Sequence, residues 1–358
     1  MALPIVNRMT APQRLEVGVL GATGTVGQQF VRLLSVHPWF RPAWLAASER
    51  SQGLAYRDAT NWRLSSPLPE DVGAARVEEC VPGRGPQLVF SGLDANVARE
   101  IEPAFAAAGH LVVSNARSFR MEPDVPLVIP EVNPDHLSLL ERQRRERRWK
   151  GAIVTNPNCS TVVLSIVLAA LRPFGISRVM VTTLQAVSGA GYPGVASLDI
   201  LGNVVPFISG EEEKIERETQ KILGMLNGAS VTPHPMVVSA QTTRVPVVDG
   251  HTEAVSIGLE SSPEIGELRT ALERFRGEPQ ELGLPSAPAS PIVYVDAPDR
   301  PQPRLDADRE RGMAITVARL RRCPVLSAKL VALGHNTIRG AAGAAILNAE
   351  LMKARDLL

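Results

Sequence analysis

One cysteine stands between a polar turn and a long apolar run. The stretch Asn156–Val163 (NPNCSTVV) places Cys159 where a helix is expected to begin. The first N–H groups of a helix have no partner within it, and together with the helix dipole they favour a thiolate. A free cysteine is more often a small buried hydrophobe. Here a nucleotide-binding fingerprint upstream and a candidate base downstream favour a nucleophile.

A glycine-rich loop is the second chemical signal. The apolar strand expected over Leu15–Leu20 runs directly into GATGTVG, and an amphipathic helix is expected over Gln28–Leu34. Glycines between a strand and a helix allow a tight turn and let the backbone approach a pyrophosphate, which the helix N-terminus then binds. The residues assigned to the dinucleotide are Gly21, Thr23, Gly24, Thr25, Val26 and Gly27.

The end of the second expected strand, over 43–47, indicates which dinucleotide binds. It is followed by Ser48, Glu49, Arg50 and Ser51. A cation between hydroxyl groups suits a 2′-phosphate, so Ser48, Arg50 and Ser51 favour NADP over NAD. Glu49 leaves NAD open, because a carboxylate at this place can bind the 2′-hydroxyl instead.

Composition limits the class of protein. The chain has 358 residues, 44% of them hydrophobic, and a net charge of +1, so it is long enough for two domains and indicates no nucleic-acid partner. Its three cysteines are widely separated, which predicts neither a disulfide framework nor a metal site. Residues 1–14 do not resemble a secretion signal and are expected to be disordered. With no apolar run of about 18 residues, we expect a cytoplasmic protein without a membrane segment.

The elements divide into two patterns. Through the first 150 or so residues, short apolar strands alternate with helices, which predicts an α/β domain with a Rossmann-like parallel sheet. After Cys159, strands outnumber helices, which predicts an α+β domain with a mixed, largely antiparallel sheet. Strands of this second part are expected over 178–186, 236–240, 254–259, 292–295 and 313–320, and a final helix over 338–357.

Several longer motifs resemble a known family. GATGTVG, SNARSFRM, PNCST, QAVSGAGYPG, GEEEK, TTRVPVVDGHTE, RPQPRLD and HNTIRGAAG occur in this order from Leu15 to the final helix. Together they resemble the archaeal and fungal branch of the aspartate-β-semialdehyde dehydrogenases. The resemblance implies reduction of β-aspartyl phosphate to aspartate semialdehyde with NADPH and release of phosphate, a step towards lysine, threonine and methionine. It also implies a homodimer or homotetramer.

The resemblance implies a domain division and four residues at the reaction centre. The NADP-binding domain would comprise 15–157 plus 336–358, and the catalytic and dimerisation domain 158–335. Cys159 would be the nucleophile, His251 the proton acceptor, Gln185 the amide that orients the substrate, and Asn158 a donor to the developing oxyanion. By residue type alone, any of the six histidines is more often a surface or core group, and Asn158 could simply cap the helix.

Charged residues are assigned to the substrate in the same way. Arg244 would hold the α-carboxylate with its guanidinium fork, and Glu211 would meet the amino group. Lys214, on the same helical face as Glu211, and Arg120, assisted by Asn115, would bind phosphate. The plainer alternatives are a surface salt bridge for Arg244 and an exposed first helical turn for the GEEEK run. Which of the glutamates 211–213 meets the substrate stays open.

The remaining assignments concern the nicotinamide side of the site, where Asn336 could equally cap the final helix. They are Ser188, Gly189, Asn336 and Thr337. The nearest rival on this scaffold is an acyl-CoA reductase such as malonyl-CoA reductase, which shares the cysteine chemistry. N-acetylglutamyl-phosphate reductase is more distant. A non-catalytic NADP-binding protein and a cysteine hydrolase are the rivals from other classes.

Overall fold

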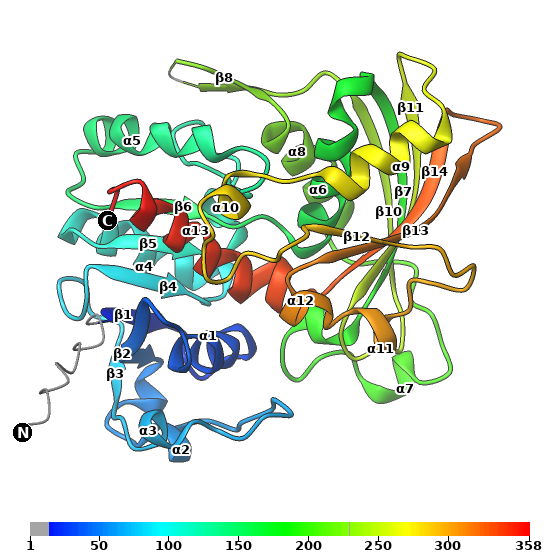
Figure 1. Cartoon of the computed structure of the whole chain (residues 1–358). Coiled ribbons are helices and arrows are strands. Elements are labelled where there is room, and N and C mark those ends of the chain that lie inside the picture. Colours follow the sequence, from blue (N-terminus) through cyan, green and yellow to red (C-terminus); the bar gives the residue numbers. More distant parts are fainter. Residues whose placement is uncertain (1–13, 229) are drawn as a thin grey trace, which may run out of the picture.

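The computed structural model describes residues 14–228 and 230–358, and two six-stranded sheets organise them. The two sheets lie side by side, and the helices that cover the second sheet lie on the side that faces the first sheet (Figure 1). The prediction that residues 1–14 are disordered concerns residues outside the described range, except for Arg14. No helix among the described residues is long and apolar enough to cross a membrane.

The first sheet is parallel throughout, as predicted. Its strand order is β3-β2-β1-β4-β5-β6, and every pairing in it is parallel. The order reverses between β1 and β4, the place where open α/β sheets bind ligands beyond the carboxyl ends of their strands. The strands are β1 Leu15–Leu20, β2 Phe40–Ala47, β3 Val77–Glu79, β4 Leu88–Ser91, β5 Leu111–Ser114 and β6 Ala152–Thr155.

Helices of the chain's two ends pack on this sheet. Side chains of the last helix, such as Ile346 and Leu351, share one apolar core with Val17 and Phe90 of the strands. The last helix therefore lies beside strands that precede it by more than half the chain (Figure 1). The helices of this part are α1 Thr25–Ser35, α2 Tyr56–Ala59, α3 Glu70–Gly73, α4 Ala95–Ala108, α5 Leu139–Arg147 and α13 Gly343–Ala354, with the short turns η1 Glu49–Ser51, η2 Arg117–Phe119 and η3 Pro134–Ser138.

The second sheet is mixed and largely antiparallel, again as predicted. Its order is β10-β7-β11-β14-β13-β12, with the β10/β7 and β12/β13 pairs parallel and the others antiparallel. The strands are β7 Ile176–Gln185, β10 Val237–Arg244, β11 His251–Leu259, β12 Ile292–Val295, β13 Ile315–Arg322 and β14 Ala328–Gly334, and a separate hairpin is formed by β8 Met225–Asn227 and β9 Ser230–Thr232.

One face of the second sheet is covered by helices and the other is open. Val179 and Val181 of β7 lie in a core with residues of three helices, whereas the alternate residues Met180 and Leu184 are exposed. The covering helices are α6 Cys159–Leu171, α8 Glu211–Ile222 and α9 Ile265–Arg274. The remaining short helices are η4 Arg172–Phe174, η5 Val187–Ala190, α7 Ser197–Ile200, α10 Glu278–Glu281, α11 Pro303–Asp306 and α12 Arg309–Gly312.

A π-helical turn, η6 Ile338–Ala342, precedes α13 where the sequence predicts continuous helix. This turn contacts both α1 and α6, so it lies where the two halves of the molecule meet. A π-turn inside a helical run is often found at a functional site.

Candidate active site

Cys159 is the first residue of α6, and Asn158 caps the helix. The Asn158 side-chain oxygen accepts hydrogen bonds from the backbone N–H groups of Ser160 (2.9 Å) and Thr161 (3.2 Å). Its side-chain nitrogen donates to Glu211 Oε1 at 2.6 Å. Asn158 therefore caps helix α6, the alternative that its residue type allows, and both the oxygen and the nitrogen of its side-chain amide have hydrogen-bond partners. Cys159 N–H, as the first in the helix, has no acceptor within α6.

His251, the first residue of β11, faces the cysteine. Its Nε2 lies 3.2 Å from Cys159 Sγ, and its Nδ1 accepts a hydrogen bond from Ala186 N–H at 3.1 Å. A neutral ring that accepts at Nδ1 carries its hydrogen on Nε2 and donates it towards the sulfur. The role of His251 as proton acceptor stays a prediction. A protonated ring carries a hydrogen on both nitrogens, so Nδ1 could then no longer accept the hydrogen bond from Ala186 N–H.

Burial dominates the titration of this pair. It raises the pKa of Cys159 to about 12, an effect to which the charge of Glu211 adds, while Arg120 and Arg244 act in the opposite direction. Burial, with the nearby charge of Arg244, lowers the pKa of His251 to about 3. Desolvation therefore outweighs the predicted effect of the helix N-terminus, which favours a thiolate.

Two glycines bring other segments against the pair. A Cβ on Gly340 of η6 would lie 2.6 Å from Cys159 Cβ. A Cβ on Gly189 would lie 2.9 Å from Arg244 Nη1 and 3.1 Å from His251 Cε1. Close approach thus requires glycine at both positions. Gly189 was predicted at the site, and Gly340 was not, although it lies in the HNTIRGAAG motif.

Arg244 and Gln185 end neighbouring strands. They are partners in the β10/β7 register, and both are buried. Arg244 Nη1 donates to Ala186 O at 2.7 Å. The backbone of Ala186 therefore accepts a hydrogen bond from Arg244 and donates one to His251. The structure therefore brings the predicted carboxylate-binding arginine, the amide and the histidine to one edge of the second sheet.

The first turn of α8 supplies the acidic and basic pair. Glu211 is buried, and its Oε2 accepts from Lys214 Nζ at 2.8 Å. Burial raises the pKa of Glu211, but Lys214 and Asn158 outweigh it and hold the value below its ordinary range. Of the other two glutamates, Glu212 accepts from Thr242 N–H and Glu213 is exposed. Glu211 is the glutamate of this run that lies beside Asn158.

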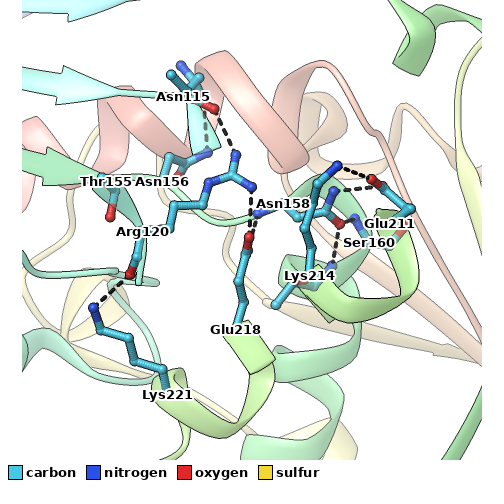
Figure 2. Close-up of polar contacts among 12 residues, drawn as sticks. Asn115, Arg120, Thr155, Asn156, Asn158, Ser160, Glu211, Lys214, Glu218 and Lys221 are labelled. Carbon is cyan, nitrogen blue, oxygen red and sulfur yellow. Dashed lines mark hydrogen bonds and ion pairs between the residues drawn. The ribbon is translucent and has the colours of Figure 1, made fainter. Parts of the chain in front are cut away.

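Arg120 is buried next to these residues and is held by partners that the sequence did not indicate. Its Nη1 donates to Glu218 Oε1 at 2.9 Å and its Nη2 to Asn115 O at 2.7 Å (Figure 2). Asn115 Oδ1 in turn accepts from Asn156 Nδ2 at 3.0 Å. Arg120 Nε has no hydrogen-bond partner among residues 14–228 and 230–358.

A cavity of about 770 Å³ opens at the carboxyl ends of the first sheet. It reaches from the glycine-rich loop to residues 190–192 of the second part. A cavity of this size beside a glycine loop and a helix N-terminus suits a dinucleotide. The predicted cofactor residues that line it are Gly21, Thr23, Gly24, Thr25, Val26, Ser48 and Arg50, and Asn61 and Arg63 are lining residues that sequence reasoning missed.

Six predicted cofactor residues are not among those lining the cavity. Gly27 packs against the loop, since a Cβ there would lie 2.2 Å from Gly21 O. Asn336 Nδ2 donates to Ser188 Oγ at 2.8 Å, while its Oδ1 accepts from Gly250 N–H at 2.8 Å. It does not cap a helix in this arrangement. The six are Gly27, Ser51, Ser188, Gly189, Asn336 and Thr337.

The cysteines of the described chain are free, and residues 14–228 and 230–358 hold no cluster of three or more side chains suited to a metal ion.

Known families match both halves of the chain. Residues 16–140 match the family described as semialdehyde dehydrogenase, NAD binding domain, and residues 168–339 match semialdehyde dehydrogenase, dimerisation domain. Together with the cysteine at the helix N-terminus, these matches define the class as a semialdehyde dehydrogenase with a domain that binds NAD(P).

Individual relatives narrow the class further. The aspartate-semialdehyde dehydrogenase of Methanothermobacter thermautotrophicus is 54% identical over 343 residues, which is 94% of this chain and 99% of the relative. The crystal structure of the Candida albicans enzyme with NADP is 44% identical and has a TM-score of 0.89, covering 97% of this chain and all (100%) of that one. A Vibrio cholerae structure complexed with ASA is 27% identical, with a TM-score of 0.76 over 97% and 100%.

The chain belongs to the aspartate-semialdehyde dehydrogenase family, and its fold and its activity as an enzyme are those of that family.

Proposed function

We propose that this enzyme reduces β-aspartyl phosphate with NADPH through a thioester on Cys159. The observation that carries the proposal is the 3.2 Å contact between Cys159 Sγ and His251 Nε2 at the start of α6. The charges of Arg120 and Arg244 act on this cysteine. A nucleophile, a proton-bearing partner and separate cations for carboxylate and phosphate are what acyl transfer between sulfur and phosphate needs.

In the proposed reaction the Cys159 thiolate attacks the acyl carbon, the C–S bond forms, and the C–O bond to phosphate breaks. His251 takes up the proton of Cys159 before attack, and the resulting imidazolium donates from Nε2 to stabilise the thiolate, as it does again when the sulfur leaves. The backbone N–H of Cys159 would donate to the developing oxyanion, and the second hydrogen of the Asn158 amide, whose first binds Glu211, would assist it. When bound, the cofactor supplies the hydride that converts the thioester to the aldehyde level.

Two groups of charges would hold the substrate in this reaction. Arg244 would grip the α-carboxylate, and Glu211 would accept a hydrogen bond from the ammonium group. Lys214 and the unpartnered Nε of Arg120 would hold the phosphate. Separate cations for the two anionic groups orient the acyl carbon between them, which is how binding contributes to rate.

NADP is the proposed dinucleotide. Ser48 and Arg50 line the cavity and can bind a 2′-phosphate, and Arg63 lines it as well. Glu49 lines the same cavity, so the preference for NADP depends on these cations outweighing one carboxylate. The Candida albicans relative, crystallised with NADP, supports this choice.

We further propose a cytoplasmic homo-oligomer, a dimer or a tetramer, with the domain division predicted from the sequence. The match to a dimerisation domain supports association, and so does the open face of the second sheet. Met180, Leu184 and Val237 there are 54%, 41% and 64% exposed. Clustered exposed apolar side chains are typical of an interface between subunits.

A comparison of acyl acceptors tests the proposed reaction. Run in the oxidative direction, the enzyme should form NADPH from aspartate semialdehyde only with phosphate or its analogue arsenate. Coenzyme A should not replace phosphate. Activity that requires coenzyme A and ignores phosphate would instead identify an acyl-CoA reductase, and no turnover with either acceptor would contradict both assignments.

A further inference from the structure

One face of α8 carries four charged residues, Glu211, Lys214, Glu218 and Lys221. Residues at this spacing lie on one side of a helix. Charged residues in such a row are usually solvated, yet Glu218 is 2% exposed and Lys221 5%. The row points towards Arg120 and the start of α6 (Figure 2). The proposed reaction uses Glu211 and Lys214 and leaves the other two without a role.

Glu218 joins two parts of the site with its two oxygens. Oε1 accepts from Arg120 Nη1 at 2.9 Å, and Oε2 accepts from the backbone N–H of Asn158 at 2.7 Å. Asn158 is the residue that caps α6 and precedes the nucleophile. One carboxylate thus fixes both the guanidinium group of Arg120 and the peptide next to Cys159.

Lys221 holds the backbone that carries Arg120. Its Nζ donates to the carbonyl oxygens of Arg120 (2.7 Å), Glu122 (2.8 Å) and Val125 (2.9 Å). All three ammonium hydrogens therefore have acceptors. Because Lys221 already holds this segment in place, Glu218 is not needed for that purpose, and its contact acts on the Arg120 side chain.

A buried ion pair is costly unless hydrogen bonds satisfy its remaining atoms, and it is a poor way to gain stability. In this pair both carboxylate oxygens have donors, whereas Arg120 Nε is buried and has no partner within the described part of the chain. The anion is satisfied and the cation keeps a free donor. This asymmetry is what a site needs if the cation is to be held in place and still bind a further anion.

We propose that Glu218 is a positioning residue, which holds Arg120 and the peptide before Cys159 in one fixed arrangement. This arrangement would keep the bound phosphate group at a fixed place relative to the Cys159 sulfur. The inference rests on the proposed function, because it takes Arg120 as a phosphate ligand. Glu218 itself touches neither substrate nor cofactor in this account.

Glu218→Gln tests this role with little change in shape. An amide offers one oxygen and one NH₂ group, so one of the two donors facing position 218 would meet another donor. We expect the Michaelis constant for phosphate to rise about tenfold, the effect of one lost charge-assisted hydrogen bond. Alkylation of Cys159 by iodoacetamide at fixed pH should slow several-fold, because Arg120 favours the thiolate and would be displaced. The Michaelis constant for semialdehyde and the affinity for NADP should change little.

Glu213→Gln is the matched control, since Glu213 is exposed on the same helix. If Glu218→Gln leaves the phosphate Michaelis constant or the alkylation rate of Cys159 at the value of this control, the proposed role of Glu218 is refuted. A lower thermal midpoint with both readouts unchanged would mean that Glu218 is structural only. If Glu218→Gln does not fold, Glu218→Asp keeps the charge but draws the carboxylate back from Arg120 and Asn158, and it should produce the same two changes.

The two readouts also separate this inference from the proposed function. If the unaltered enzyme does not respond to phosphate at all, the proposed function fails. The alkylation rate does not depend on turnover, so it still decides whether Glu218 controls the surroundings of Cys159. An unchanged rate in Glu218→Gln would then refute the inference independently.

Discussion

The Cys159 thiol is subject to opposing influences. The helix N-terminus, Arg120 and Arg244 favour the thiolate, while burial and Glu211 favour the thiol and raise the pKa to about 12. Burial is the largest of these influences. Activation of the thiol depends on the charges that surround it, and so on how the residues near Cys159 are held.

Lys214 is the cation whose role is tested most simply. Lys214→Ala should raise the Michaelis constant for phosphate by roughly tenfold, because a charge-assisted contact to phosphate is lost. The constant for semialdehyde should rise less. Steady-state kinetics with phosphate varied at saturating semialdehyde provide the measurement, and Lys353→Ala, at an exposed lysine of α13, is the control. An unchanged phosphate constant would remove Lys214 from the phosphate site.

Gly340 leaves no room for a side chain beside the nucleophile. Gly340→Ala would place a Cβ 2.6 Å from Cys159 Cβ, so one of the two segments has to shift. We expect a loss of about 1–3 kcal/mol of stability from overpacking. A shift of about 1 Å at the nucleophile can lower the rate about 10²-fold.

Thermal unfolding and initial rates of Gly340→Ala test this expectation. Gly266→Ala is the matched control, because Gly266 lies in a helix and has open space around it. Full activity in Gly340→Ala would mean that the contact between η6 and Cys159 is unimportant for the chemistry.

Among the elements, strand and helix types were predicted better than their ends. The strand patterns predicted β7 and most of β11, but β14 was missed, because AKLVALG is a mostly apolar run without alternation. The π-helical turn before α13 could not be predicted from periodicity, because Ile338 and Gly340 continue an ordinary helical pattern. Its geometry depends on packing against α1 and α6, which lie far away in the sequence.

A fully buried ion pair ties η6 to the rest of the molecule. Arg339 Nη2 donates to Glu131 Oε2 at 2.7 Å, and both side chains are 0% exposed. Glu131→Ala should lower stability by about 3–5 kcal/mol, because the guanidinium group would be left buried and unpaired. Asp296→Ala, which breaks an exposed pair with Arg269, should change the thermal midpoint little. Equal midpoints for the two variants would contradict this account of η6.

At the scale of the whole molecule, the sequence predicts both types of sheet. The family resemblance, rather than local pattern, predicts site roles for His251, Arg244, Gln185, Glu211 and Lys214. Glu218 was not predicted, because a charged residue in a helical run reads as solvated and only tertiary contacts bury it. The domain division and the roles of single residues stay predictions.

The pH dependence of stability gives a test of the first domain. Burial raises the pKa of Glu102 to about 7 from an ordinary value of 4.5. A carboxyl group whose pKa is higher in the folded state stabilises the fold fully below about pH 4.5 and loses this contribution as the pH rises through 7. Each unit of that shift corresponds to about 1.4 kcal/mol.

Glu102→Gln should abolish this loss, since the amide mimics the protonated acid. The fall in thermal midpoint between about pH 5 and pH 8 should therefore be smaller in the variant than in the unaltered enzyme. Equal falls would mean that Glu102 is ionised in the folded protein at acidic pH.

The most direct test weighs the enzyme during turnover. Incubated with aspartate semialdehyde and NADP but without phosphate, the protein should gain the mass of one aspartyl acyl group, and peptide mapping should locate it on Cys159. Addition of phosphate should remove it, and Cys159→Ser should gain no such mass while it still binds NADP. Turnover without any acyl group on Cys159, or with the group on another residue, would contradict the thioester mechanism.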